Sequence, residues 1–224
     1  MKKSRVLKEQ LNELFQKLWT ARMHYEIFHV FTNEIDRPKF VDVMNRYIEF
    51  FRPTITAHFG SMVTSLGTIY DKTPQSIHLS KLIKKLQTTP SVDQKAILEV
   101  LNLIQKTQPL VQKTLILRNN VIAHLLEALT VQEVFEKAQV TRYNFRELID
   151  DTERVLQEIG RLIGESYVPP LSLSSEKGTR AMLYDLWMFR ECEEAHPEEM
   201  WSFEEQLRSR FLTKRPDVSS SVAR

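Results

Sequence analysis

The chain has 224 residues, of which 42% are hydrophobic and 27% are charged, so it is long enough to bury a core. Five glycines and nine prolines are few, which argues against a β-sandwich or a disordered chain and favours a helix-rich protein. The one cysteine, Cys192, excludes an internal disulfide framework and any zinc site built from cysteines. There is no signal peptide and no run of about 20 apolar residues, so we expect a soluble cytoplasmic protein with no membrane association.

The small net charge of +2 hides an uneven distribution along the chain. Residues 1–128 contain 18 Lys and Arg against 11 Asp and Glu, whereas residues 129–224 contain 13 against 18. A basic first half could attract a polyanion such as nucleic acid. A solvated surface with uneven charge explains the same numbers, so the charge leaves both interpretations open.

Apolar residues at helical spacing predict amphipathic helices through the first half of the chain. Residues 4–32 hold a seven-residue apolar rhythm, which predicts one long helix. A second helix is expected over 38–66, and Pro53 in its middle should kink or split it. We expect a loop over 67–75, after which Ser76 fits as the N-cap of a short helix.

The next helix is the longest, and it opens after a turn at residues 88–91. One face of it follows steps of three and four residues: Ile97, Leu101, Ile104, Gln108, Val111, Leu115, Arg118, Ile122 and Leu125. Arg118 therefore lies where a core residue is expected, and a buried guanidinium needs a partner for its charge. His124 edges the same face, and Asn120, four residues before it, is its nearest neighbour along the helix.

The second half of the chain is expected to complete the helical domain and to add an extension. Thr130 to Glu133 has the form of a capping box for a short helix, and a further amphipathic helix is expected over 142–166. Prolines and serines then mark a linker. The fold class is all-α, with about five core helices. The expected boundaries are 1–167 for a helical bundle, 168–175 for the linker, 176–213 for a C-terminal helical extension and 214–224 for a disordered tail.

Several motifs together resemble a known superfamily. The run Arg118-Asn119-Asn120-Val121-Ile122-Ala123-His124, at the end of a long helix, is similar to the signature of the HEPN superfamily (higher eukaryotes and prokaryotes nucleotide-binding domains). The most similar branch is named after abortive-infection phage-resistance proteins, and the likeness covers roughly residues 5–167. Other segments that fit this branch are Trp19, Tyr25 and Phe28 in the first helix, the run 65–71 and the run 76–82.

The resemblance implies a helical bundle that forms a homodimer, with two Arg/His motifs facing each other in a cleft. Many members of the superfamily are endoribonucleases that need no metal and no other cofactor, and they often act as toxins or phage-defence effectors. The expected partners are therefore RNA as substrate, a second copy of the chain, and an antitoxin or other regulatory protein.

The residue types in the motif suit RNA cleavage without a metal. The 2′-hydroxyl attacks phosphorus, which requires a proton acceptor, a proton donor and positive charge near the crowded phosphate. Histidine exchanges protons near neutral pH, and arginine keeps its charge, so His124 and Arg118 are the catalytic candidates. One histidine cannot readily be base and acid together, whereas a dimer supplies two. By resemblance Asn119 would orient the phosphate or His124. On a strict helix Asn120 is closer to His124, so it is the substrate-binding candidate and the choice stays open.

Two other interpretations remain open. Arg…His pairs at similar spacing recur at Arg22…His29, Arg52…His58 and Arg190…His196, and about one such match is expected by chance. A non-catalytic HEPN-like dimer that binds a partner or acts as a scaffold would use the motif as a buried hydrogen-bonded pair. In addition, seven glutamates between residues 191 and 205 could make the extension a lid over a basic cleft.

Overall fold

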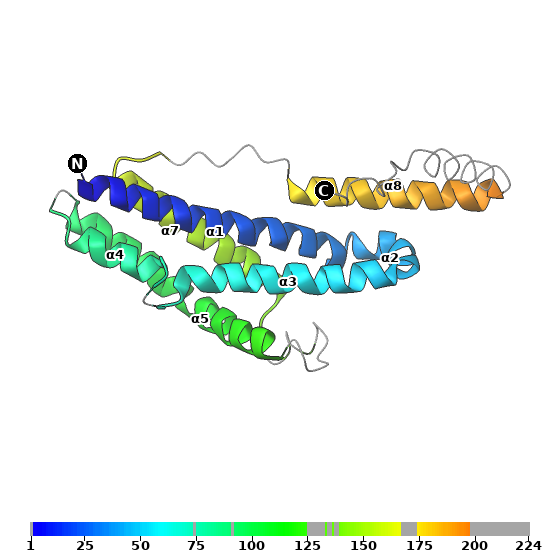
Figure 1. Ribbon diagram of the computed structural model, residues 1–224, viewed down its shortest axis with the longest axis horizontal. Helices are drawn as coiled ribbons and strands as arrows, with labels where there is room; N and C mark the ends of the chain where they lie inside the picture. Colours follow the sequence, from blue (N-terminus) through cyan, green and yellow to red (C-terminus); the bar gives the residue numbers. More distant parts are fainter. Residues whose placement is uncertain are drawn as a thin grey trace, which may run out of the picture.

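The computed structural model describes residues 2–73, 75–90, 92–124, 133, 136, 139–166 and 174–197. These residues form an elongated helical structure, and no strand occurs among them, which confirms the all-α fold class (Figure 1). The helices are α1 (Lys2–Thr32), α2 (Arg37–Arg46), α3 (Ile48–Tyr70), α4 (Leu79–Gln87), α5 (Gln94–His124), α7 (Arg142–Leu162) and α8 (Ser175–Ala195).

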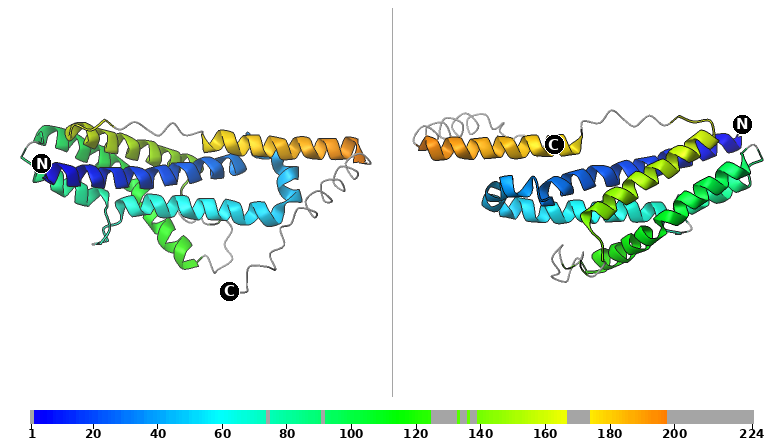
Figure 2. Two further views of the ribbon diagram at one scale, coloured as in Figure 1. Left: turned by 45° about the horizontal axis from the view of Figure 1, so that its top comes forward. Right: turned by 180° about the vertical axis from the view of Figure 1, so that it is seen from behind.

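Five of these helices form the bundle, as the sequence predicts. Helices α1 and α3 lie side by side along their length, α7 packs against α1 and α5, and α5 also packs against α3 (Figures 1 and 2). The short helix α4 contacts α1, α3 and α5 at one end of the bundle. Helix α8 is the C-terminal extension, and it packs against α1 and α2 on the side of α1 away from α5.

One contiguous hydrophobic core runs through the bundle. Each helix contributes the apolar face that its periodicity predicts, and each fully buried large side chain stabilises the fold by roughly 1.5–3 kcal/mol. Side chains with essentially no exposed area include Leu14 and Phe28 of α1, Met62 and Leu66 of α3, Leu82 and Leu86 of α4, and Leu148 and Leu156 of α7.

The predicted helix over 38–66 is broken at a different residue from the expected one. The break lies at Tyr47, where φ is −110° and ψ is 39°, and α3 then passes through Pro53 without interruption. Pro53 is the sixth residue of α3, so its missing N–H costs one bond, to the carbonyl of Glu49. A break at Tyr47 instead turns α2 so that Phe40 and Met44 are buried.

The segment between α3 and α4 also differs from the prediction. Residues 67–70 belong to α3 and are not a loop, because Ile69 and Tyr70 are buried in the core. Ser76 is not the N-cap of α4. The N-cap of α4 is His78, whose Nδ1 accepts a hydrogen bond from the backbone N–H of Lys81 at 3.2 Å.

The buried face of α5 lies about one residue earlier than the predicted stripe. Gln108 is exposed, whereas Thr107 and Thr114 are buried and bond their hydroxyls to backbone carbonyls one turn before them. Threonine satisfies its own hydroxyl in this way, so it can occupy a core position that the apolar pattern does not reveal.

Helix α8 closes a second, smaller apolar cluster at the far end of the bundle, formed by Val30, Phe31, Phe40, Met44, Phe51 and Leu183. The predicted short helix after Thr130, most of the linker, the helix expected after Pro197 and the tail lie outside the described residues. The domain boundaries therefore stay a prediction. None of the helices described is long and apolar enough to cross a lipid bilayer.

Candidate functional site

Arg118 lies in the last two turns of α5, where this helix crosses α3. Its side chain is 17% exposed, and its aliphatic part lies directly on Gly67 of α3. A Cβ atom at Gly67 would be only 2.5 Å from Cδ of Arg118, so the two helices can approach in this way only because residue 67 has no side chain. The aliphatic part of Arg118, which we call its stem, thus fills the space between α3 and α5, called the α3–α5 seam. Its guanidinium lies at the C-terminal end of α3.

The guanidinium is held by two polar side chains. Its Nη1 donates a hydrogen bond of 2.8 Å to Oδ2 of Asp71, the C-cap residue of α3. Nη2 and Nε donate to Oδ1 of Asn119 at 3.2 and 3.4 Å. The Arg118 hydrogen bond, with a second one from Thr73 at 2.9 Å, lowers the pKa of the Asp71 carboxyl. Asp71 therefore stays ionised and fixes Arg118 in place.

His78, the residue before α4, has three lysines near it. Lys81, Lys17 and Lys84 each lower the pKa of His78, in addition to the larger effect of its burial, and Asp71 opposes them. Because Nδ1 of His78 accepts the capping hydrogen bond, its ring is neutral and carries its proton on Nε2. His78 is thus a helix cap, and one of these lysines, Lys17, is paired with Glu13 at 3.0 Å.

The structure brings together two of the four residues that the sequence singled out. Arg118 and Asn119 are in contact, whereas the side chains of Asn120 and His124 lie outside what the structure describes. The distance between Arg118 and His124 therefore stays a prediction. Asp71 was missed as a site residue because residues 67–75 were expected to form a loop, in which an aspartate would cap or pair only locally. The available signal was its place at the end of the run 65–71.

Two of the other Arg…His pairs have arginines in ion pairs with acids. Arg22 pairs with Asp150 and Glu153, and Arg190 pairs with Glu194 and Asp42.

Among the residues described, no three His, Cys, Asp or Glu side chains are grouped so that they could hold a metal ion. Helix α8 lies on the side of α1 away from α5, so this part of the extension does not cover Arg118 (Figure 2).

Comparison with protein-family models gives one match that spans most of the chain. Residues 6–178 match HEPN_AbiU2, the family described as AbiU2. The chain belongs to this HEPN family. No curated protein and no solved structure matched. The match spans the bundle helices of this AbiU2-family protein, apart from the first four residues of α1, and both residues of the Arg118–Asp71 contact. It ends within the first turn of α8.

Proposed function

We propose that this AbiU2-family protein is a metal-independent endoribonuclease that acts in phage defence, with its active site at a homodimer interface. The observation that carries the proposal is the placement of Arg118. Its charge is held in a seam between α3 and α5 by Asp71 and Asn119, six residues before His124 in a HEPN chain. A pre-positioned guanidinium of this kind is what the transition state of phosphodiester cleavage needs.

The hydrogen bonds of Arg118 leave room for a phosphate. A guanidinium has five N–H donors, of which Asp71 uses one on Nη1 and Asn119 uses one on Nη2 and one on Nε. One N–H remains on each terminal nitrogen. A phosphate oxygen can therefore bind Arg118 while Asp71 keeps it oriented.

The proposed reaction uses the 2′-hydroxyl of the RNA. His124 of one copy accepts the 2′-hydroxyl proton as the 2′-oxygen bonds to phosphorus, and Arg118 stabilises the added negative charge. The bond from phosphorus to the 5′-oxygen breaks, and His124 of the second copy donates a proton to that oxygen. The products are a 2′,3′-cyclic phosphate and a 5′-hydroxyl.

A second candidate is a non-catalytic HEPN dimer that binds or scaffolds a partner. The observation that favours it is again the Arg118–Asp71 contact, because it joins α3 to α5 within one chain and so has a structural use without any substrate. The two candidates differ in what they predict for RNA.

The test compares the purified protein with its His124→Ala and Arg118→Ala variants on RNA in the presence of EDTA. We expect the wild type to cut and each variant to be slower by about 10² to 10⁴, the usual worth of one acid–base or charge-stabilising group. Arg154→Ala is the matched control, because Arg154 is an exposed arginine of α7 that pairs with Asp151 on its own helix.

Molecular mass must be measured in parallel, so that loss of activity is not loss of the dimer. Unchanged cutting by both variants would remove these residues from the mechanism. If the wild type cuts no RNA at all, the scaffold interpretation is favoured.

A further inference from the structure

A cavity of about 890 Å³, which we call the α2 pocket, lies where the end of α1, helix α2, the first turns of α3 and the start of α7 meet. Its lining residues on α3 are Ile48, Phe51, Arg52, Ile55 and Thr56. They recur at steps of three and four and so form one face of the helix, and the lining residues of α2 recur in the same way. A volume of this size is typical of sites that bind small molecules.

The floor of the α2 pocket is apolar and consists of side chains from several segments. Its buried members are Phe28, Phe31, Met44, Phe51 and Val140. Phe31, Met44 and Phe51 also belong to the second apolar cluster, so close packing holds them in place. A buried floor that is apolar and rich in aromatic rings favours a ligand with an apolar body.

Many polar side chains of the α2 pocket already have partners within the protein. Asn33 bonds to backbone groups on either side of it, and the hydroxyl of Thr32 donates to a backbone carbonyl of α1 at 2.7 Å. Glu34 is the one acidic residue among the described residues of the lining. Its carboxylate is bound by the guanidinium of Arg142 and by the hydroxyl of Tyr143. The negative charge of the lining is therefore matched by an arginine of the same pocket.

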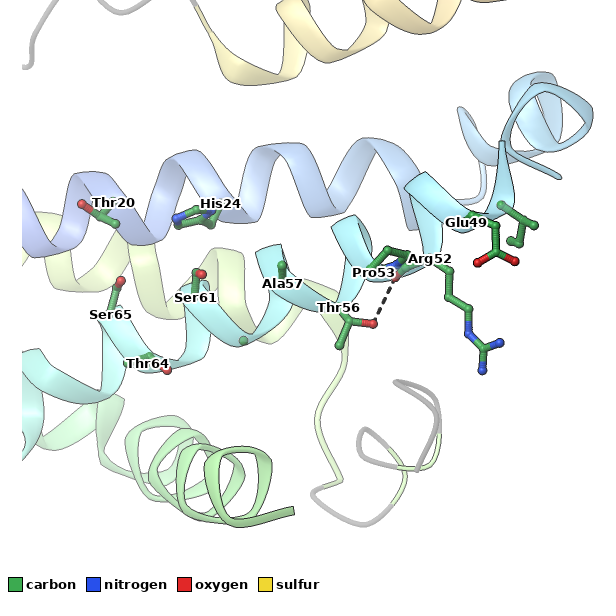
Figure 3. Close-up of a pocket in the computed structure, with 12 residues that line it drawn as sticks. Thr20, His24, Glu49, Arg52, Pro53, Thr56, Ala57, Ser61, Thr64 and Ser65 are labelled. Carbon is green, nitrogen blue, oxygen red and sulfur yellow. Dashed lines mark hydrogen bonds between the residues drawn. The ribbon is translucent and has the colours of Figure 1, made fainter. Parts of the chain in front are cut away.

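The polar side chains that remain at the open side of the pocket are hydrogen-bond donors. Among the described residues, the side chains of Arg37, Asn45 and Arg52 have no hydrogen bond and no ion pair, and all three are exposed. Glu49, three residues before Arg52, lines a neighbouring groove instead, and no ion pair joins the two side chains. Figure 3, a view of that groove, shows Arg52 extending away from α3. Two arginines at the opening favour a ligand whose polar end is an anion.

We infer that the α2 pocket binds a small organic anion, with its apolar body on the buried floor and a carboxylate, sulfonate or phosphate group against Arg37 and Arg52. Such a ligand would bridge α2 and the start of α7. Arg52 precedes Gly67 by 15 residues on α3, which is about 22 Å at 1.5 Å per residue, so this pocket is separate from the Arg118 site. The inference therefore does not depend on the proposed function.

Two probes of nearly the same shape separate the contribution of charge from that of the apolar body. Naphthalene-2-sulfonate is an anion at pH 7, whereas naphthalene-2-sulfonamide is neutral. Isothermal titration calorimetry measures the binding of each to the full chain. We expect one sulfonate to bind per chain, with an affinity about tenfold or more above that of the sulfonamide, since only the anion forms charge-assisted hydrogen bonds with the arginines.

Variants of the lining place the bound probe in the α2 pocket. Arg37→Gln and Arg52→Gln should each weaken sulfonate binding by about tenfold and leave sulfonamide binding unchanged. Ile48→Trp should prevent the binding of both probes, because Ile48 lines the pocket and is 44% exposed, so a larger ring there occupies the opening. The matched controls are Arg154→Gln on α7 and Leu98→Trp on α5, two exposed residues outside the lining, and both should bind the probes normally.

Three results would overturn the inference. Equal affinity for the two probes would mean that the arginines select no anion. Sulfonate binding that Ile48→Trp and both arginine variants leave unchanged would place the probe elsewhere on the protein. The third is the absence of sulfonate binding at about 1 mM, which is weaker than a built site would give. Arg37→Gln and Arg52→Gln change only exposed side chains, so they keep the test valid even if Ile48→Trp fails to fold. The assay contains no RNA, so its result is independent of the nuclease proposal.

Discussion

Gly67 is the residue on which the contact between Arg118 and Asp71 depends. A side chain at this position would occupy the space in which the Arg118 stem lies, with Cδ only 2.5 Å from the new Cβ. Arg118 would then have to move, and the 2.8 Å hydrogen bond to Asp71 would be lost or lengthened. At this scale, the absence of one side chain positions the proposed catalytic charge.

Gly67→Ala and Gly60→Ala place the same methyl group on the same helix and should have different effects. Gly60→Ala should raise the free energy of unfolding by about 1 kcal/mol, because alanine is the better helix former and its Cβ meets nothing. Gly67→Ala should raise the free energy of unfolding by less than this, or lower it. The rate of RNA cutting by this variant should fall by about tenfold or more. Urea denaturation and the cutting assay measure both effects. Equal stabilisation with unchanged cutting would show that Arg118 needs no open space at residue 67.

The seam between α1 and α3 contains a pair of half-buried histidines. Nδ1 of His24 and Nδ1 of His58 are 2.8 Å apart, so one ring donates a hydrogen bond and the other, which accepts it, is neutral at that nitrogen. Burial lowers the pKa of His24, and burial followed by the charge of His24 lowers the pKa of His58. Helices α1 and α3 are thus joined by a hydrogen bond between two histidines, and protonation of both rings disrupts it.

The stability of this seam should depend on pH in a definite direction. A histidine whose pKa is lowered in the folded state is protonated in the unfolded chain at a higher pH than in the folded one. Its contribution to the free energy of unfolding is therefore fully present above about pH 6.5 and declines as the pH falls. The double variant His24→Gln, His58→Gln cannot titrate there. It should therefore lose less stability than the wild type between pH 7 and 5, as measured by urea denaturation. His29 and His78 titrate in both proteins and cancel, so equal slopes would contradict a role for the pair.

The molecule as a whole consists of the five-helix bundle and a helix attached to one end of it. Helix α8 contacts α1 and α2, where Leu183 is fully buried in the second apolar cluster. Ion pairs surround this contact, including that of Arg180 with the buried Asp36 at 2.8 Å, and the Arg180 hydrogen bond lowers the pKa of Asp36. Several large side chains on the rest of α8 remain exposed. The helix is therefore held by the buried Leu183, by the partly buried Leu186, by the edge-on contact of Tyr184 with Phe40, and by a set of charges.

Leu183→Ala should release α8 while the bundle stays folded. A fully buried leucine cut back to alanine costs about 3 kcal/mol, and here the loss falls on the docking of one helix. Hydrogen exchange should become faster in α8 and remain unchanged in α3 and α7. The control is Met182→Ala, because the neighbouring Met182 is 36% exposed and its truncation should change little. Uniformly faster exchange in all helices would show instead that α8 and the bundle unfold together.

The amino-acid pattern predicted the all-α class, the long helices and the position of Arg118 on the inner side of α5, because periodicity depends only on residues that are close along the chain. The same sequence also contains the motif at residues 118–124 on which the resemblance to the HEPN superfamily rests. The helix break at Tyr47, the cap at His78 and the partner of Arg118 were not predicted. Asp71 is 47 residues from Arg118, and their contact exists because two helices cross over a glycine. Local spacing gives the faces of the helices, whereas side-chain packing between distant segments selects which charges meet.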